Sequence, residues 1–178
     1  QLATLWSDIR IDHLGYQDRA TQQRKFQRNL RLLRMDYAVN PDDESTLLHL
    51  GLSYYLLCRM DEARDYLTKV VSQGTKGGDH LRQVYACLAQ IPLREGNVRG
   101  ALATLDQALA AFPTDDYLLY LQAECFYELD EYHAAESALL RVQANTARTV
   151  YQGGLPGDLK NHLAPRRLAD VLRLQRRF

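Results

Sequence analysis

The chain has 178 residues, of which 46% are hydrophobic, and its 22 Lys and Arg side chains balance 22 Asp and Glu side chains. This length and composition predict about one globular domain with a sizeable core. The zero net charge disfavours a strongly basic nucleic-acid-binding protein and an acidic disordered tail. No apolar run approaches the roughly 18 residues that span a bilayer, and no signal peptide opens the chain.

The residue types favour a helical protein of the cytoplasm. The sequence holds 31 Leu and 19 Ala, which are helix formers, against 8 Val and 3 Ile, which favour strands. Its three cysteines are too widely spaced for a Cys-x-x-Cys pair, which indicates reduced thiols rather than disulfides or a zinc site. We therefore expect an all-α fold.

Charge is unevenly distributed along the chain. Residues 1–35 carry seven basic and three acidic side chains, a balance of +4, and residues 148–178 carry seven and two, a balance of +5. Residues 36–147 carry eight basic and seventeen acidic side chains, a balance of −9. Solvated helix faces explain such a pattern, and the alternative is basic ends that contact an acidic partner or a neighbouring domain.

The first forty residues predict two different segments. Apolar and charged residues alternate around Ile9 and Ile11, as in a short strand, and the chain starts at Gln1 rather than Met. We interpret this segment as an extended remnant of an upstream domain. Residues 19–39 predict one long helix that caps the first repeat, with an apolar side at spacings i, i+4, i+7 and i+11: Phe26, Leu30, Leu33 and Tyr37.

A pattern then repeats along the chain. Leu47, Leu50, Gly51 and Tyr54 are followed by Ala63 and by further apolar residues at helical spacing. The same frame fits again from residues 82 and 116, which are 34 residues apart, while a four-residue insertion within 72–79 separates the first two copies. Each copy predicts two helices joined by a turn. Paired small residues at positions 8 and 20 let the two helices approach closely: Gly51 with Ala63, Ala89 with Ala101, and Ala123 with Ala135.

Three residues depart from this frame. Pro92 lies inside the first helix of the second copy, where it removes a hydrogen bond and should kink or end the helix. Gln122 replaces an apolar residue in the third copy, and Cys58 replaces a turn glycine in the first. A fourth copy begins after a glycine-proline loop, with Leu168, Ala169 and Leu172 at positions 7, 8 and 11.

The pattern resembles the tetratricopeptide repeat family over about two thirds of the chain. The resemblance implies an antiparallel helix-pair solenoid that forms a right-handed superhelix. The predicted organisation comprises an extended remnant at 1–16, a capping helix at 17–43, repeats at 44–77, 78–115 and 116–149, a Gly/Pro loop at 150–161, and the first helix of a truncated fourth repeat at 162–178.

The family resemblance also implies a binding surface. In this family, positions 2, 5, 9 and 12 of the first helix of each repeat line a concave groove. The predicted groove residues are Leu48, Leu52, Tyr55, Gln83, Gln90, Leu93, Tyr117, Tyr120, Glu124 and Tyr127. This aromatic and aliphatic lining with few charges suits a protein or peptide segment, or a sugar. The alternative is that several of these side chains only fill half-buried packing positions.

A second, narrower resemblance concerns the start of the chain. Residues 8–16, followed by Lys25, residues 28–33, residues 41–43 and Leu50-Gly51, look like the junction between catalytic domain and repeat array in bacterial family 2 glycosyltransferases. The resemblance implies a parent that transfers a sugar from a nucleotide donor. The catalytic Asp-x-Asp motif is absent from this sequence. His13 is a candidate for a late metal-site histidine of such folds, or otherwise a packing residue.

No other catalytic, metal or cofactor site is predicted. The five histidines are scattered, no phosphate-binding loop is present, and the acidic pairs at 42–43 and 115–116 suit helix caps better than catalysis. We therefore predict a non-catalytic scaffold without cofactor that binds protein, with self-association as a possible second property and without nucleic acid or a membrane span. The leading hypothesis places it within a larger glycosyltransferase, and the alternative is a stand-alone adaptor.

Overall fold

The computed structural model describes residues 19–74, 79–145 and 159–175, and these residues contain helices and no strand. The helices are α1 (Arg19–Val39), α2 (Glu44–Leu56), α3 (Met60–Ser72), α4 (Asp79–Arg94), α5 (Val98–Ala111), α6 (Asp116–Glu128), α7 (Tyr132–Ala144), the π-helical turn η2 (Leu159–Leu163) and α8 (Ala164–Gln175). The strand-like segment expected at 1–16 lies outside the described residues. The expected loop at 150–161 also lies outside them, except that its last three residues are helical.

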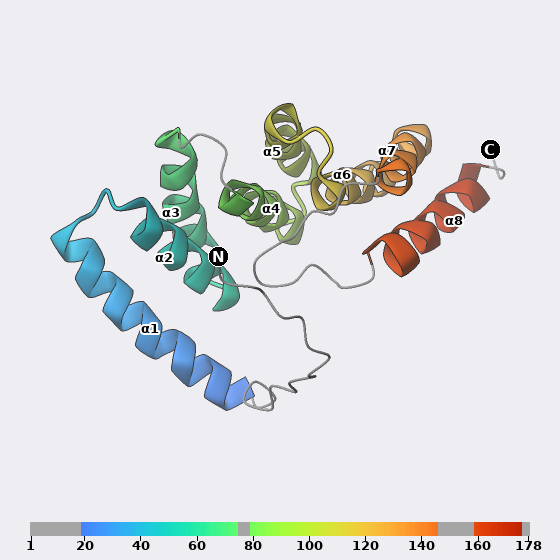
Figure 1. Cartoon of the computed structure of the whole chain (residues 1–178). Helices are drawn as coiled ribbons and strands as arrows, with labels where there is room; N and C mark the ends of the chain where they lie inside the picture. The colour runs from blue at the N-terminus through green and yellow to red at the C-terminus, as the bar shows by residue number, and fades with distance from the viewer. Residues whose placement is uncertain (1–18, 75–78, 146–158, 176–178) are drawn as a thin grey trace, which may run out of the picture.

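Successive helix pairs form a curved row from α1 to α8 (Figure 1). The pairs α2/α3, α4/α5 and α6/α7 are hairpins, and each second helix also contacts the first helix of the next pair. The first helices of neighbouring pairs touch as well, α2 with α4 and α4 with α6. The all-α repeat solenoid predicted from the sequence is therefore confirmed.

Small side chains bring the two helices of each hairpin together. Ala63, Ala101 and Ala135 are completely buried, as are Ala89 and Ala123 opposite them. The first hairpin is packed most closely at its glycine: a Cβ atom placed on Gly51 would lie 2.5 Å from Leu67 Cδ2 and 3.3 Å from the Leu67 backbone nitrogen. Non-bonded carbon atoms pack no closer than about 3.5 Å, so a methyl group fits here only if Leu67 shifts.

The turn between the two helices has the same left-handed backbone in all three hairpins. Its central residue has φ of +59° at Cys58, +76° at Gly96 and +60° at Asp130. Left-handed backbone costs an ordinary residue roughly 1–2 kcal/mol, whereas glycine adopts it freely. Cys58 thus occupies a glycine conformation, as its position in the repeat indicates.

Aspartates begin two of the first helices. The Asp43 carboxylate accepts a hydrogen bond from the Thr46 backbone N–H at 2.7 Å, and Asp115 accepts from those of Tyr117 and Leu118 at 3.0 Å. The bonds from Thr46 hold the pKa of Asp43 below its ordinary value. These carboxylates satisfy amide groups that the helix leaves without an internal partner, so the capping role predicted for the acidic pairs is confirmed at Asp43 and Asp115.

The two other departures from the repeat are accommodated locally. Pro92 lies in the last turn of α4, and the helix ends two residues later at Arg94. The Gln122 side chain is half-buried and donates a hydrogen bond to Asp106 of α5 at 3.0 Å. The polar residue therefore links two neighbouring helices at a position that is usually apolar.

The end helices differ in how well the sequence predicted them. In α1 the side that faces the row consists of buried Leu30 and half-buried Phe26, Leu33 and Tyr37, with the spacing that the sequence indicates. In α8 the predicted register is wrong: Ala169 is exposed, whereas Ala164 and Val171 are completely buried against the core.

Candidate functional site

The ten predicted groove residues lie on the first helices of the three hairpins, and all of them are half-buried. Three are on α2, three on α4 and four on α6. Several also pack against the core, as the alternative interpretation of the sequence proposed. Those with a packing contact are Leu48, Leu52, Tyr55, Leu93, Tyr117, Tyr120 and Tyr127. The first helix of each hairpin (α2, α4 and α6) is its A helix, so we call the surface formed by these ten residues the A-helix face.

One glutamine joins all three helices of the A-helix face. The Tyr55 hydroxyl of α2 donates to Gln90 Oε1 of α4 at 3.0 Å, and Gln90 Nε2 donates to the Ala86 carbonyl at 3.2 Å. A further hydrogen bond links the Gln90 side chain to Tyr117 of α6. Tyr55, Gln90 and Tyr117 therefore form a continuous strip across three successive repeats.

The tyrosines of this strip stay protonated over the physiological range. Burial, reinforced by Cys87, raises the pKa of Tyr55 to about 12, and burial also raises the pKa of Tyr117. Each keeps a hydroxyl that can donate or accept a hydrogen bond beside an apolar ring. The Arg94 guanidinium lies 4.8 Å from the centroid of the Tyr55 ring and adds a cation at the edge of the strip.

A second group gathers where α6 meets α8. Glu124 accepts two hydrogen bonds from Arg167, at 2.6 Å from Nε and 2.7 Å from Nη2, and the guanidinium lies 4.2 Å from the Tyr127 ring centroid. Burial, followed by the charge of Glu124, raises the pKa of Tyr120 to about 12. The charge of Glu124 is thus already balanced within the chain, which leaves this part of the face with little net charge.

Arg94 and Arg167 were not among the predicted residues. Arg94 directly follows Leu93 and lies one helical turn after Gln90, so a face drawn one residue wider at the end of this helix would have included it. Arg167 reaches α6 from a helix 43 residues away in sequence, and its role depends on how α8 packs. Sequence spacing alone carries no signal for that contact.

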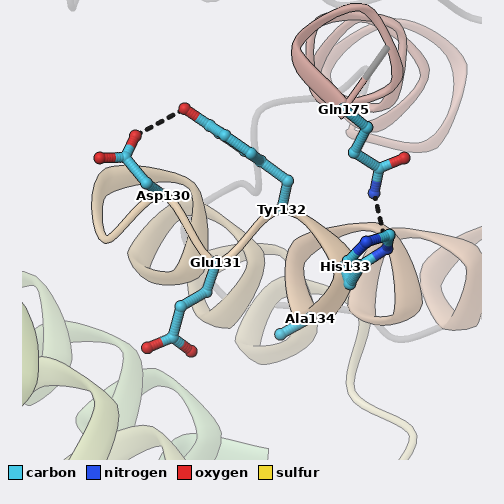
Figure 2. A pocket seen from close by; sticks show the side chains of 6 residues that line it. All are labelled: Asp130, Glu131, Tyr132, His133, Ala134 and Gln175. Atoms are coloured by element: carbon cyan, nitrogen blue, oxygen red, sulfur yellow. Dashed lines mark hydrogen bonds between the residues drawn. The ribbon is translucent and has the colours of Figure 1, made fainter. Parts of the chain in front are cut away.

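A separate hollow of about 760 Å³ lies between the α6–α7 turn and the end of α8 (Figure 2). Its lining consists of Asp130, Glu131, Tyr132, His133, Ala134 and Gln175. Figure 2 shows the Tyr132 hydroxyl directed at Asp130, to which it donates at 2.5 Å, and Gln175 reaching from α8 to His133 Nδ1 at 3.3 Å. None of the ten predicted groove residues lines this hollow.

Neither a metal site nor a membrane span is found in the described part of the chain. Among residues 19–74, 79–145 and 159–175, no group of three or more His, Cys, Asp or Glu side chains could hold a metal ion. No helix in those ranges combines the length and the hydropathy needed to cross a membrane. His13 lies outside them.

Comparison with known proteins identifies the repeats. Two family models, each described as a tetratricopeptide repeat, match residues 45–73 and 93–155. No curated protein matches the chain.

Solved structures share the fold. A crystal structure of MamA is 18% identical, with a TM-score of 0.61 over 91% of this chain and 97% of that one, and a second MamA structure is 16% identical, with a TM-score of 0.62 over 85% and 80%. YrrB, a TPR protein with an unusual peptide-binding site, is 15% identical, with a TM-score of 0.59 over 87% and 80%. With the repeat frame, the hairpin geometry and the two family matches, the chain belongs to the tetratricopeptide repeat family.

Proposed function

We propose that the chain is a non-catalytic protein-interaction scaffold whose A-helix face binds a peptide segment. The tetratricopeptide fold, which is typically non-catalytic, supports the first part of the proposal. The second part draws on the structural likeness to YrrB, which has a peptide-binding site, and on the chemistry of the A-helix face.

The observation that carries the proposal is the strip formed by Tyr55, Gln90 and Tyr117. Three repeats contribute one polar side chain each, and hydrogen bonds hold all three in fixed positions. Fixed groups lose little conformational freedom when a ligand binds, which favours affinity. The hydroxyl and amide groups can pair with the backbone of an extended peptide, while the rings and the neighbouring leucines contact its apolar side chains.

The charge of the face indicates which peptides it accepts. Glu124 is paired with Arg167, and Arg94 lies over the Tyr55 ring, so the face offers one cation at its edge and little other net charge. We expect preferred ligands to be apolar and aromatic segments, with an acidic residue placed to meet Arg94. Strongly basic segments should bind poorly because Arg94 repels them.

A displayed library of random peptides tests the proposal. Peptides selected on the wild-type chain are measured by titration calorimetry against Gln90→Ala, which removes the central group of the strip while keeping a good helix former. We expect affinity to fall at least about tenfold, because peptide polar groups lose a buried partner. Leu140→Ala on exposed α7 is the matched control and should leave binding unchanged.

The result that would overturn the proposal is equal affinity of the selected peptides for the wild-type chain and for Gln90→Ala. Circular dichroism of both proteins establishes that helicity is intact. Tyr117→Phe, which keeps the ring and removes only the hydroxyl, then separates the hydrogen-bonding contribution from the contribution of the aromatic surface.

The finer hypothesis, that the array follows a glycosyltransferase catalytic domain and positions a protein acceptor, rests on the resemblance of residues 8–51. Its test is the coding sequence upstream of residue 1. A preceding domain of roughly 200 residues that carries an Asp-x-Asp motif would support it. An initiator Met within a few residues would refute it and leave a stand-alone adaptor.

A further inference from the structure

Positive charge is concentrated on α1. The helix carries six Arg and Lys side chains and one carboxylate, a balance of +5 in a chain whose net charge is zero. Arg28, Arg31 and Arg34 are exposed, and none of the three pairs with a carboxylate of the described residues. The one acidic residue of the helix, Asp36, comes two positions after Arg34, and residues at that spacing do not face each other. These cations are therefore not neutralised within α1.

Two of these arginines line a hollow where α1 meets the turn between α2 and α3. The hollow has a volume of about 550 Å³, and its polar lining consists of Gln27, Arg31 and Arg34 of α1 together with Arg59, the residue that precedes α3. The three residues of α1 recur at i, i+4 and i+7, so they lie on one side of the helix. Within the described parts of the chain, no carboxylate lines this space. We call it the arginine hollow.

Tyr54 holds two of the three guanidinium groups in place. Arg34 donates to the Tyr54 hydroxyl from Nε at 3.0 Å and from Nη2 at 2.8 Å. The Arg59 guanidinium lies 4.8 Å from the centroid of the same ring, and Tyr54 itself is buried. Arg34 uses two of its five N–H groups in these bonds, which leaves three for a ligand. A guanidinium that is already fixed loses less conformational freedom when a ligand binds.

The charge of the arginine hollow determines which ligand it suits. Glu62 accepts a hydrogen bond from Arg59 and offsets one of the three positive charges. This hydrogen bond, reinforced by the charges of Arg59 and Arg34, holds the pKa of Glu62 below its ordinary value, so its carboxylate is ionised at neutral pH. The preceding acidic residue, Asp61, pairs with Arg64 instead. Three guanidinium groups and one carboxylate leave a charge of +2 at the hollow.

We propose that the arginine hollow binds a phosphoryl group, carried either by a small phosphate ester or by a phosphorylated side chain of a partner protein. A phosphate monoester carries a charge of about −1.5 to −2 at pH 7 and three acceptor oxygens. It thus matches both the charge of the hollow and the three guanidinium groups that line it. A carboxylate has one charge and two oxygens, so it would leave part of the positive charge unbalanced. The planar guanidinium fork also suits paired hydrogen bonds to phosphate oxygens.

The arginine hollow shares no residue with the A-helix face, so this proposal and the peptide-binding proposal can fail independently. The test titrates the full chain at low ionic strength with inorganic phosphate and with a short peptide that carries one phosphoserine between alanines. The same peptide with glutamate in place of phosphoserine is the carboxylate comparison. NMR spectra of the arginine Nε–H groups follow binding and identify the arginines that respond.

Arg31→Gln is the decisive variant, because Arg31 is exposed and pairs with no described residue, so that the fold does not depend on it. It should weaken binding of the phosphoserine peptide at least about tenfold by removing one charge-assisted contact. Arg28→Gln is the matched control. It removes the same charge from the same helix one turn earlier, at a residue that does not line the hollow, and should change affinity by less than about twofold.

In the wild type, the Nε–H signals of Arg31, Arg34 and Arg59 should shift together and saturate with a dissociation constant of about 1 mM or less. Tighter binding of the phosphoserine peptide than of inorganic phosphate would identify a phosphorylated protein as the source, and the reverse order would identify a small phosphate ester. Three results would overturn the proposal: no saturable shift with either probe, equal affinity for the glutamate and phosphoserine peptides, or equal weakening by Arg28→Gln and Arg31→Gln. The last would show only a general attraction of anions to α1.

Discussion

Replacing Gly51 by Ala tests how closely the first hairpin is packed. Two effects oppose each other. Alanine is favoured over glycine in a helix interior by about 1 kcal/mol. Against this, the added Cβ would lie 2.5 Å from Leu67 Cδ2 and 2.6 Å from Leu67 Cγ, on a side chain that is completely buried. Such overpacking costs about 1–3 kcal/mol.

The clash outweighs the helix propensity. We therefore expect Gly51→Ala to lower the free energy of unfolding by up to about 2 kcal/mol. The corresponding positions of the other hairpins hold Ala89 and Ala123, so comparison of repeats would treat the substitution as harmless. Urea unfolding followed by circular dichroism measures the change.

A double-mutant cycle identifies the cause. Leu67→Ala removes the two clashing carbons and by itself costs about 2–5 kcal/mol. In the Gly51→Ala background it should cost about 1–3 kcal/mol less, because the new methyl group fills part of the cavity. A Gly51→Ala protein more stable than the wild type would refute the reasoning, since it would show that the helices can separate at no cost.

Three further predictions concern the turns, the contact of α8 and the response to alkali. The turn residues Cys58 and Gly96 have φ of +59° and +76°, so Cys58→Gly should raise the free energy of unfolding by about 0.5–1 kcal/mol and Gly96→Ala should lower it by about 1 kcal/mol. Urea unfolding measures both changes, and equal stability of the wild type and the two variants would contradict the prediction. Arg167→Ala removes two charge-assisted hydrogen bonds to half-buried Glu124 and should therefore destabilise the docking of α8 by about 1–2 kcal/mol. Hydrogen exchange should then become faster across Ala164–Gln175 and stay unchanged in α2. Burial raises the pKa of the Cys87 and Cys125 thiols from 9.0 to about 12, so the folded chain holds these protons more tightly than the unfolded chain, and the free energy of unfolding should fall as pH rises from about 9 to about 12. At mildly alkaline pH, iodoacetamide should modify exposed Cys58 first, and modification of Cys87 at the same rate would show that the Cys87 thiol is accessible rather than buried.

The sequence predicted most of the repeat architecture because each hairpin depends on the spacing of residues that lie close together in the chain. Spacing of apolar and small residues located the hairpins, and the side of α1 that packs on the row follows from Leu30 and its neighbours. The turn position predicted a glycine conformation for Cys58, and the φ of +59° has that form. Each of these features depends on residues within about one repeat of one another.

The features that the sequence did not predict depend on contacts over longer distances. The register of α8 could not be carried across the glycine-proline segment, since the repeat period is interrupted there, and Ala169 was assigned to the wrong side. Arg94 and Arg167 are placed over tyrosine rings by packing between different helices. The ten groove residues are half-buried as a binding face requires, and whether they bind a peptide stays a prediction.

The bond between Arg167 and Glu124 has a mechanical consequence. It joins α8 directly to α6, passing over α7, and so restrains the angle at which the last helix leaves the row. The Lys160–Asp116 ion pair gives a second link from the η2 turn to α6, and Gln175 holds the far end of α8 against Glu136 of α7. The last helix is therefore tied at several points along its length to two different helices, and these ties together oppose a change in the bend at this end of the row.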